Sequence, residues 1–123
     1  KLKNKNIDSI FLLSPTTEDD RIKLIIDQAS GFIYYVSLKG VTGSSNIDIN
    51  QVSERVKNIK QFTSLPIGVG FGVRDAKTAK DVAMVADAVV VGSRIVQEVE
   101  TSSKEDLLQN INKLMTEIKE AIS

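Results

Sequence analysis

The 123-residue sequence contains neither cysteine nor histidine. Without cysteine there are no disulfides, thiolate nucleophiles or zinc–thiolate sites. Without histidine there are no Ser-His dyads and no imidazole acid–base chemistry, and the commonest metal ligand is missing. Any chemistry that these residues perform therefore depends on carboxylates, lysines, hydroxyls and backbone amides.

The sequence also lacks an excess of charge of either sign. Sixteen Lys and Arg residues balance sixteen Asp and Glu residues, which argues against nucleic acid or an anionic membrane as a partner. No apolar run approaches the ~20 residues that span a bilayer. The first residues, KLKNKN, have no apolar stretch of the signal-peptide kind. We therefore expect a single cytoplasmic domain over residues 1–123, with 41% hydrophobic residues to form its core.

Four apolar stretches bounded by turn residues predict strands, and helical spacing of apolar residues between them predicts helices. The strands are expected at residues 7–13, 32–38, 67–71 and 88–92. Helix starts are expected after Thr16 or Thr17, after Asp75, and at Ser102, whose spacing to Glu105 is that of a capping box.

The predicted order is βαβαβαβα, which is typical of an α/β protein with a parallel sheet covered by helices. Four units of roughly 30 residues match half of the ~250 residues of an eight-unit barrel. The count therefore indicates half of a TIM (βα)8 barrel. A flavodoxin-like layered sheet has the same alternation, and periodicity does not separate the two.

Glycines stand where three of the predicted strands end, and two of these glycine turns lead into helix starts. In either fold, ligands bind beyond the carboxyl ends of the strands. Gly70-Phe71-Gly72 and Gly92-Ser93 therefore predict a phosphate cradle, because glycine lets backbone amides approach an anion. The simpler alternative is that these glycines only satisfy turns and close packing. The GxGxG beginning at Gly68 is weak evidence for a dinucleotide site, since the third Rossmann glycine is missing.

Acidic and aromatic residues give weaker signals. Glu18, Asp19 and Asp20 are most simply a solvated helix start, and we find no pair of buried carboxylates suited to acid–base catalysis. We also predict no metal site. Tyr34 and Tyr35 are expected on opposite faces of one strand, one of them toward the barrel interior or a ligand.

Four segments together carry a resemblance: PTTEDDRIKLI, SGFIYYVSLKGVTGSS, LPIGVGFGVRDA and ADAVVVGSRIV. In this order and spacing they closely resemble the alpha subunit of tryptophan synthase. The matching part is the carboxy-terminal half, units five to eight of a (βα)8 barrel. The resemblance, rather than periodicity, favours the barrel over the layered sheet.

The family cleaves indole-3-glycerol phosphate to indole and glyceraldehyde 3-phosphate. It works in an α2β2 complex with a beta subunit, to which the pyridoxal phosphate belongs, and the alpha subunit needs no cofactor. The resemblance implies that Tyr34 lines the indole side of the substrate and that Thr42 closes the loop over the site. It implies that the substrate phosphate is held by Gly43, Phe71, Gly72, Gly92 and Ser93.

The resemblance also implies what is missing. The catalytic glutamate and aspartate of the family come from the first half of the barrel, so we expect no catalytic residue here and a fragment that is inactive alone. Half a barrel has two open strand edges and an uncovered apolar face, which predicts self-association. Two alternatives stay open: a different phosphate-binding barrel enzyme acting on a sugar or heterocycle phosphate, and a non-catalytic half-barrel module that only assembles.

Overall fold

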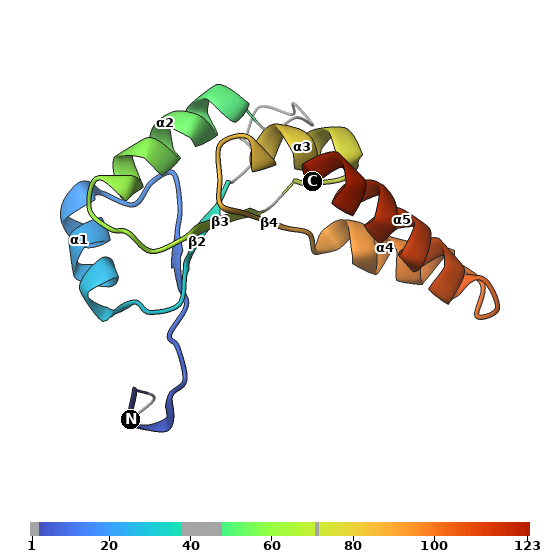
Figure 1. Ribbon diagram of the computed structural model, residues 1–123, viewed down its shortest axis with the longest axis horizontal. Helices are drawn as coiled ribbons and strands as arrows, with labels where there is room; N and C mark the ends of the chain where they lie inside the picture. Colours follow the sequence, from blue (N-terminus) through green and yellow to red (C-terminus); the bar gives the residue numbers. More distant parts are fainter. Residues whose placement is uncertain (1–2, 38–47, 71) are drawn as a thin grey trace.

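The computed structural model describes residues 3–37, 48–70 and 72–123. After a short 3-10 turn at Lys3–Lys5, strands and helices alternate along the chain (Figure 1). The strands are β1 (Phe11–Leu13), β2 (Ile33–Val36), β3 (Ile67–Gly70) and β4 (Ala88–Val90). The helices are α1 (Asp19–Gln28), α2 (Ile49–Lys60), α3 (Ala76–Ala83), α4 (Ser93–Thr101) and α5 (Leu107–Ile122).

The four strands form one parallel sheet in the order β1-β2-β3-β4. Strand order therefore follows chain order, and β1 and β4 are the edges. The register places Leu12, Tyr34, Gly68 and Ala88 in one row across the sheet. The predicted α/β class with a parallel sheet is confirmed.

One face of the sheet carries the hydrophobic core. Leu13, Ile33, Tyr35, Ile67 and Val69 point to this face and are each at most 1% exposed. Helices α1, α2, α3 and α5 lie against it, arranged in an arc along the same side (Figure 1). Their buried contributions are Ile22, Val52, Val56, Ile59, Ala79, Val82, Leu114 and Ile118.

The opposite face is apolar yet uncovered by any helix in the described parts of the chain. Leu12 is 59% exposed there, Ala88 is exposed, and Tyr34 and Val90 are half-buried. Apolar residues therefore point to both faces of the sheet, which is typical of a parallel sheet that is covered on both sides. In Figure 1 the uncovered face lies on the inner, concave side of the arc of helices.

Gly70 on β3 makes room for a tyrosine from the neighbouring strand. A Cβ atom at Gly70 would lie 2.5 Å from the Tyr34 hydroxyl and 2.9 Å from Cβ of Val90. At Gly68 the nearest atom would be in the Phe32 ring, at 3.3 Å. The glycines of β3 are therefore required by side chains packed over the strand, most strictly at Gly70.

The helix starts differ in part from those expected. Asp75 caps α3 in a reciprocal capping box, because its carboxylate accepts from the Thr78 N–H at 2.8 Å and the Asp75 N–H donates to the Thr78 hydroxyl at 3.2 Å. These bonds to Thr78 lower the pKa of Asp75. The predicted threonine cap of α1 is wrong. Thr17 instead accepts from the N–H of Ser14, and Glu18 precedes the helix without a side-chain cap bond.

The last part of the chain forms two helices where one was expected. The helix α4 begins directly after β4, and Ser102 ends it rather than beginning the next helix. The capping role predicted for Ser102 and Glu105 is therefore wrong, and α5 begins only at Leu107. A short exposed turn, in which the Ser103 hydroxyl donates to Asp106 at 2.9 Å, joins the two helices.

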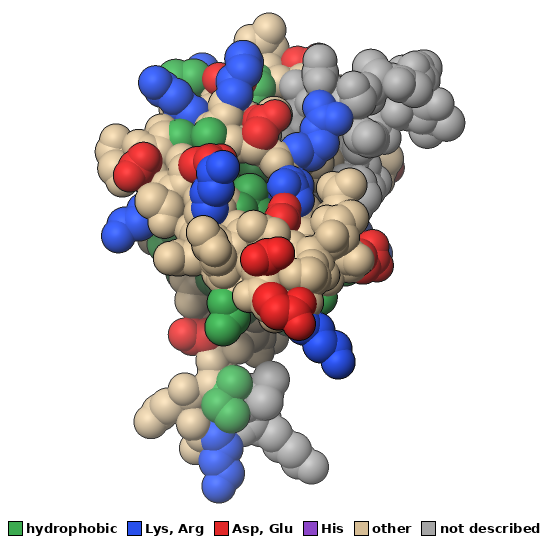
Figure 2. Space-filling model, turned by 90° about the vertical axis from the view of Figure 1, so that its right-hand side faces the viewer, with side chains coloured by type: hydrophobic (Ala, Val, Ile, Leu, Met, Phe, Trp, Pro, Cys, Tyr) green, Lys and Arg blue, Asp and Glu red, His purple; other side chains and the backbone are tan. Residues whose placement is uncertain are grey.

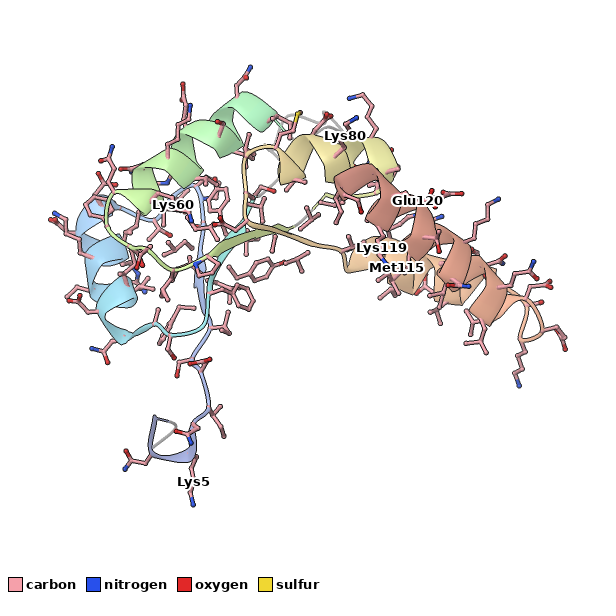
Figure 3. The ribbon with its side chains drawn as sticks, viewed as in Figure 1. Lys5, Lys60, Lys80, Met115, Lys119 and Glu120 are labelled. Atoms are coloured by element: carbon pink, nitrogen blue, oxygen red, sulfur yellow. The ribbon has the colours of Figure 1, made fainter. Side chains whose placement is uncertain are left out.

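Polar bonds fix the amino-terminal ends of β3 and β4 relative to each other. Asp87, just before β4, accepts from the Ile67 N–H at 2.7 Å and pairs at 2.6 Å with Lys60. Figure 3 labels Lys60 at the end of α2. The Lys60 ammonium, and then the Ile67 N–H, lower the pKa of Asp87. These contacts connect α2 to the starts of β3 and β4.

One side of the molecule has a surface of mixed charge. Figure 2 shows lysine and arginine side chains interspersed with aspartate and glutamate over the face that it presents, without a large region of one sign. None of the helices in the described ranges combines the length and apolar character that crossing a bilayer requires.

Candidate phosphate site at the strand ends

A hollow of about 300 Å³ opens at the carboxyl ends of β2, β3 and β4. We call it the strand-end hollow. Four of its lining residues were singled out from the sequence, namely Tyr34, Gly72, Gly92 and Ser93. The others are Val73, Arg74, Val90, Arg94 and Gln97. Its volume lies at the lower end of the range for small-molecule sites.

The two glycines of the hollow differ in backbone conformation and in the space around them. Gly72 has φ of 90°, a left-handed conformation that side chains rarely adopt. Gly92 has negative φ, and a Cβ atom there would meet nothing within 4 Å. The protein therefore does not require glycine at position 92 for packing. The open space beside it is part of the hollow.

The helix α4 gives Gly92-Ser93 a defined geometry. Gly92 is the N-cap of α4, and its carbonyl accepts from the N–H groups of Ile95 and Val96. The first N–H groups of a helix have no acceptor within it, and the helix dipole makes this end positive. The amides of Ser93 and Arg94 are thus the free amides of the helix start, beside the hollow. Such an end is a ready binding site for an anion.

The Ser37 hydroxyl fixes the turn after β3. It donates to the carbonyl of Gly70 at 2.8 Å, and the Ser37 N–H donates to the same oxygen at 3.1 Å. Ser37 is 93% buried, so these bonds are shielded from water. They hold the end of β2 to the last residue of β3, two residues before Gly72.

Tyr34 and Tyr35 point to opposite faces, as expected. Tyr34 is half-buried and lines the strand-end hollow, whereas Tyr35 is 1% exposed in the core beneath the helices. Burial raises the pKa of Tyr35, although the charge of Arg55 opposes the shift. Tyr34 is therefore the tyrosine that a ligand in the hollow can touch.

Three predicted site residues, Thr42, Gly43 and Phe71, lie outside the described residues. The structure adds Arg74, Arg94 and Gln97, which sequence reasoning did not assign to the site. Arg94 directly follows Ser93 in the sequence, and this adjacency was the available signal. Arg74 directly precedes Asp75, the N-cap of α3.

No aspartate or glutamate is among the residues found to line the hollow. Within the described ranges there is also no group of three acidic residues placed to hold a metal ion. The hollow thus offers amides, a hydroxyl, a phenol and two guanidinium groups. This set can bind an anionic group and a flat apolar group, but it has no carboxylate to move a proton.

Known proteins similar to this chain share one family. The family model described as "Tryptophan synthase alpha chain" matches residues 1–123. The alpha chain of Nitrosomonas europaea is 51% identical over 121 residues, which are 98% of this chain and 44% of that protein. The corresponding chain of a Janthinobacterium species is 53% identical over 98% of this chain and 46% of that protein.

Solved structures match in the same way. Tryptophan synthase subunit alpha of Legionella pneumophila superposes with a TM-score of 0.81 at 31% identity, covering 98% of this chain and 44% of that one. The α/β fold found here is therefore a part of the (βα)8 barrel of those structures. The chain spans less than half the length of the relatives that it matches. With the family model matched over its whole length, the chain belongs to the tryptophan synthase alpha chain family.

Proposed function

We propose that this chain is the phosphate-binding, carboxy-terminal part of a lyase that cleaves indole-3-glycerol phosphate to indole and glyceraldehyde 3-phosphate in tryptophan biosynthesis. The observation that carries the proposal is the meeting of Tyr34, Gly72, Gly92 and Ser93 in one hollow. In this assignment the amides around Gly72 and at Ser93 hold the substrate phosphate. Tyr34 faces the indole.

The placement as units five to eight is supported by the short helix after the last strand. In (βα)8 barrels a phosphate site is frequently formed by the loops after strands seven and eight and by the N-terminus of a short extra helix. Here β3, β4 and α4 have this arrangement, with α4 inserted before the long helix α5. The strands β3 and β4 then correspond to strands seven and eight.

Catalysis in this proposal is divided between two parts of the barrel. No carboxylate is among the described residues that line the hollow, and the catalytic glutamate and aspartate of the family belong to the first half. The chain alone is then a binding part without lyase activity. The family resemblance also assigns Thr42, Gly43 and Phe71 to this site, and these three residues lie outside the described ranges.

The partner in this proposal is the beta subunit, with which the alpha chain forms an α2β2 complex. The alpha chain of the family works without a cofactor of its own, and pyridoxal phosphate belongs to the beta subunit. As part of such a biosynthetic enzyme, the chain is proposed to be cytoplasmic.

Fragment complementation tests the function and the placement together. The chain is mixed with the part of the Nitrosomonas europaea alpha chain that precedes the proposed matching region, and indole release from indole-3-glycerol phosphate is measured. We expect activity from the mixture and none above background from either part alone. The matched control is the mixture with the carboxy-terminal part of the relative, which duplicates this chain and should stay inactive.

Activity restored by the carboxy-terminal part instead would show that this chain is the amino-terminal part and would overturn the placement. Activity with neither part, although both fold, would favour the non-catalytic module over the enzyme.

The uncovered face of the sheet leads us to propose self-association of the chain on its own. Leu12 on that face is 59% exposed, and a groove beside β4 is lined by Val91, Met115 and Lys119 (Figure 3). A two-fold axis would place β4 of each copy next to β1 of the other, with all strands parallel, and would close both edges. Exposed apolar surface and unpaired edges both favour such pairing.

Sedimentation velocity over a range of concentrations tests this assembly. We expect a dimer or larger species, and a Leu12→Lys variant should shift the equilibrium toward monomer because it places a charge on the uncovered face. A compact monomer of the unsubstituted chain at high concentration would contradict the proposal.

A further inference from the structure

Two arginines line the strand-end hollow, and the proposed phosphate site gives neither of them a role. They are Arg74 and Arg94, and none of the residues found to line the hollow carries a negative charge. Backbone amides bind a singly or doubly charged anion with little discrimination, whereas a guanidinium adds a full charge and paired donors. The guanidinium groups therefore bear on which ionisation state the hollow prefers.

Arg94 is held by an acidic partner outside the hollow. Its Nη2 atom lies 2.7 Å from Oε2 of Glu98, one turn later on α4, and the two side chains are only 28% and 16% exposed. The other oxygen of Glu98 accepts from the Ser102 hydroxyl at 3.3 Å, and that hydroxyl accepts from the Asn110 amide at 2.9 Å. A chain of polar contacts thus runs from α5 through Glu98 to Arg94.

The position of Arg94 makes this pair electrostatically relevant to a ligand. Arg94 lines the strand-end hollow and also a second, polar hollow between α4 and α5, which Glu98 and Asn110 line as well. Glu98 is among the residues that line the second hollow but not the strand-end hollow, and its carboxylate offsets the Arg94 charge from 2.7 Å. Because both groups are largely shielded from water, this offset is screened less than at an open surface.

We propose that Arg94 makes the strand-end hollow selective for a phosphate dianion and that Glu98, a positioning residue, limits how much of the Arg94 charge the ligand experiences. This inference rests on the proposed phosphate site. The substrate class is a phosphate monoester in its doubly ionised form.

The composition of the chain makes this selectivity measurable through pH. A phosphate monoester loses its second proton near pH ~6. The chain has no histidine or cysteine, so between pH 5.5 and 7.5 the side chains change charge very little while the ligand gains one. Sulfate is a dianion at both pH values and serves as the ligand control.

The experiment measures binding of glycerol phosphate and of sulfate to the chain by calorimetry at pH 5.5 and 7.5. We expect tighter binding of glycerol phosphate at pH 7.5 and no change for sulfate. In Arg94→Gln, affinity at pH 7.5 should fall about tenfold and the pH dependence should flatten, because a charged hydrogen bond is lost. Arg94→Lys should restore much of the pH dependence.

The Glu98→Gln variant distinguishes an electrostatic role of Glu98 from a purely structural one. It keeps an acceptor for Ser102 but removes the negative charge, so glycerol phosphate should bind about threefold more tightly. Arg94→Gln and Glu98→Gln break the same ion pair and should lower the thermal midpoint alike, yet they should change affinity in opposite directions. Arg21→Gln, on the exposed surface of α1, is the matched control and should change neither.

Unchanged affinity in Arg94→Gln, or a loss in Glu98→Gln that parallels it, would overturn this inference while leaving the phosphate site intact. Absence of glycerol phosphate and sulfate binding to the unsubstituted chain would overturn both the inference and the proposed site.

Discussion

A Gly72→Asp variant is expected to lose phosphate binding altogether, with affinity for glycerol phosphate at least 100-fold weaker than in the unsubstituted chain. The carboxylate would stand beside the hollow where the phosphate is proposed to lie, and like charges at close range repel strongly. The backbone adds to the effect. Position 72 has φ of 90°, which costs a residue with a side chain about 1 kcal/mol or more.

A Ser93→Asp variant separates the effect on binding from the effect on folding. Ser93 is the first residue of α4, where a negative side chain interacts favourably with the helix dipole by about 0.3–1 kcal/mol. The variant should therefore be as stable as the unsubstituted chain, or slightly more stable, while losing phosphate affinity as Gly72→Asp does. Ser93→Asn, which adds no charge, is the matched control.

Calorimetric titration with glycerol phosphate, alongside thermal unfolding of each variant, measures both quantities. Phosphate affinity that survives in both Gly72→Asp and Ser93→Asp would show that the strand-end hollow is not the phosphate site. A Ser93→Asp variant that loses affinity only because it unfolds would also contradict the assignment, since the helix start should tolerate the charge.

A Gly70→Val variant is expected to be about 3 kcal/mol less stable than the unsubstituted chain, the upper part of the range for overpacking. The first side-chain atom alone would lie 2.5 Å from the Tyr34 hydroxyl and 2.9 Å from Cβ of Val90. Gly70 is buried within β3, between two hydrogen-bonded neighbours, so the strand cannot move away freely. Tyr34 would be pushed from its place over the strand.

Urea unfolding of Gly70→Val and of Gly92→Ser provides the comparison. A Cβ atom at position 92 meets nothing within 4 Å, and serine is a good N-cap, so Gly92→Ser should unfold at nearly the same denaturant concentration as the unsubstituted chain. In the Gly70→Val background, Tyr34→Ala should recover part of the lost stability because it removes the nearer clash. Equal stability of the Gly70→Val and unsubstituted chains would refute this explanation of the glycine.

The main parts of the fold were accessible from local patterns. Apolar stretches that end at proline or glycine predicted all four strands, and the described strands are the parts of these stretches that pair across the sheet. The Asp75 cap was predictable since its capping box involves residues three positions apart. Family membership agrees with the resemblance carried by the glycine-containing segments.

The misassigned helix starts share a cause. Thr17 and Ser102 are both good caps by residue type, but each makes its bonds elsewhere: Thr17 with Ser14, and Ser102 with Glu98 and Asn110. Short side chains of this kind have several backbone and side-chain partners within reach. Thr17 takes a local partner three residues before it, whereas the bond between Ser102 and Asn110 depends on the packing of α4 against α5, which is a tertiary feature.

Sequence alone determined the class of this protein, because the period of its apolar residues and the positions of its glycines are local properties. It also excluded thiol and imidazole chemistry outright, through residues that are absent. Only the tertiary structure placed Arg94 in one hollow with Tyr34 and Gly72, and only the packing of α4 beside α5 joined Ser102 to Asn110. Only the structure distinguished the three glycines from one another. A side chain at position 70 would clash with Tyr34, Gly72 has a left-handed backbone, and Gly92 has open space beside it.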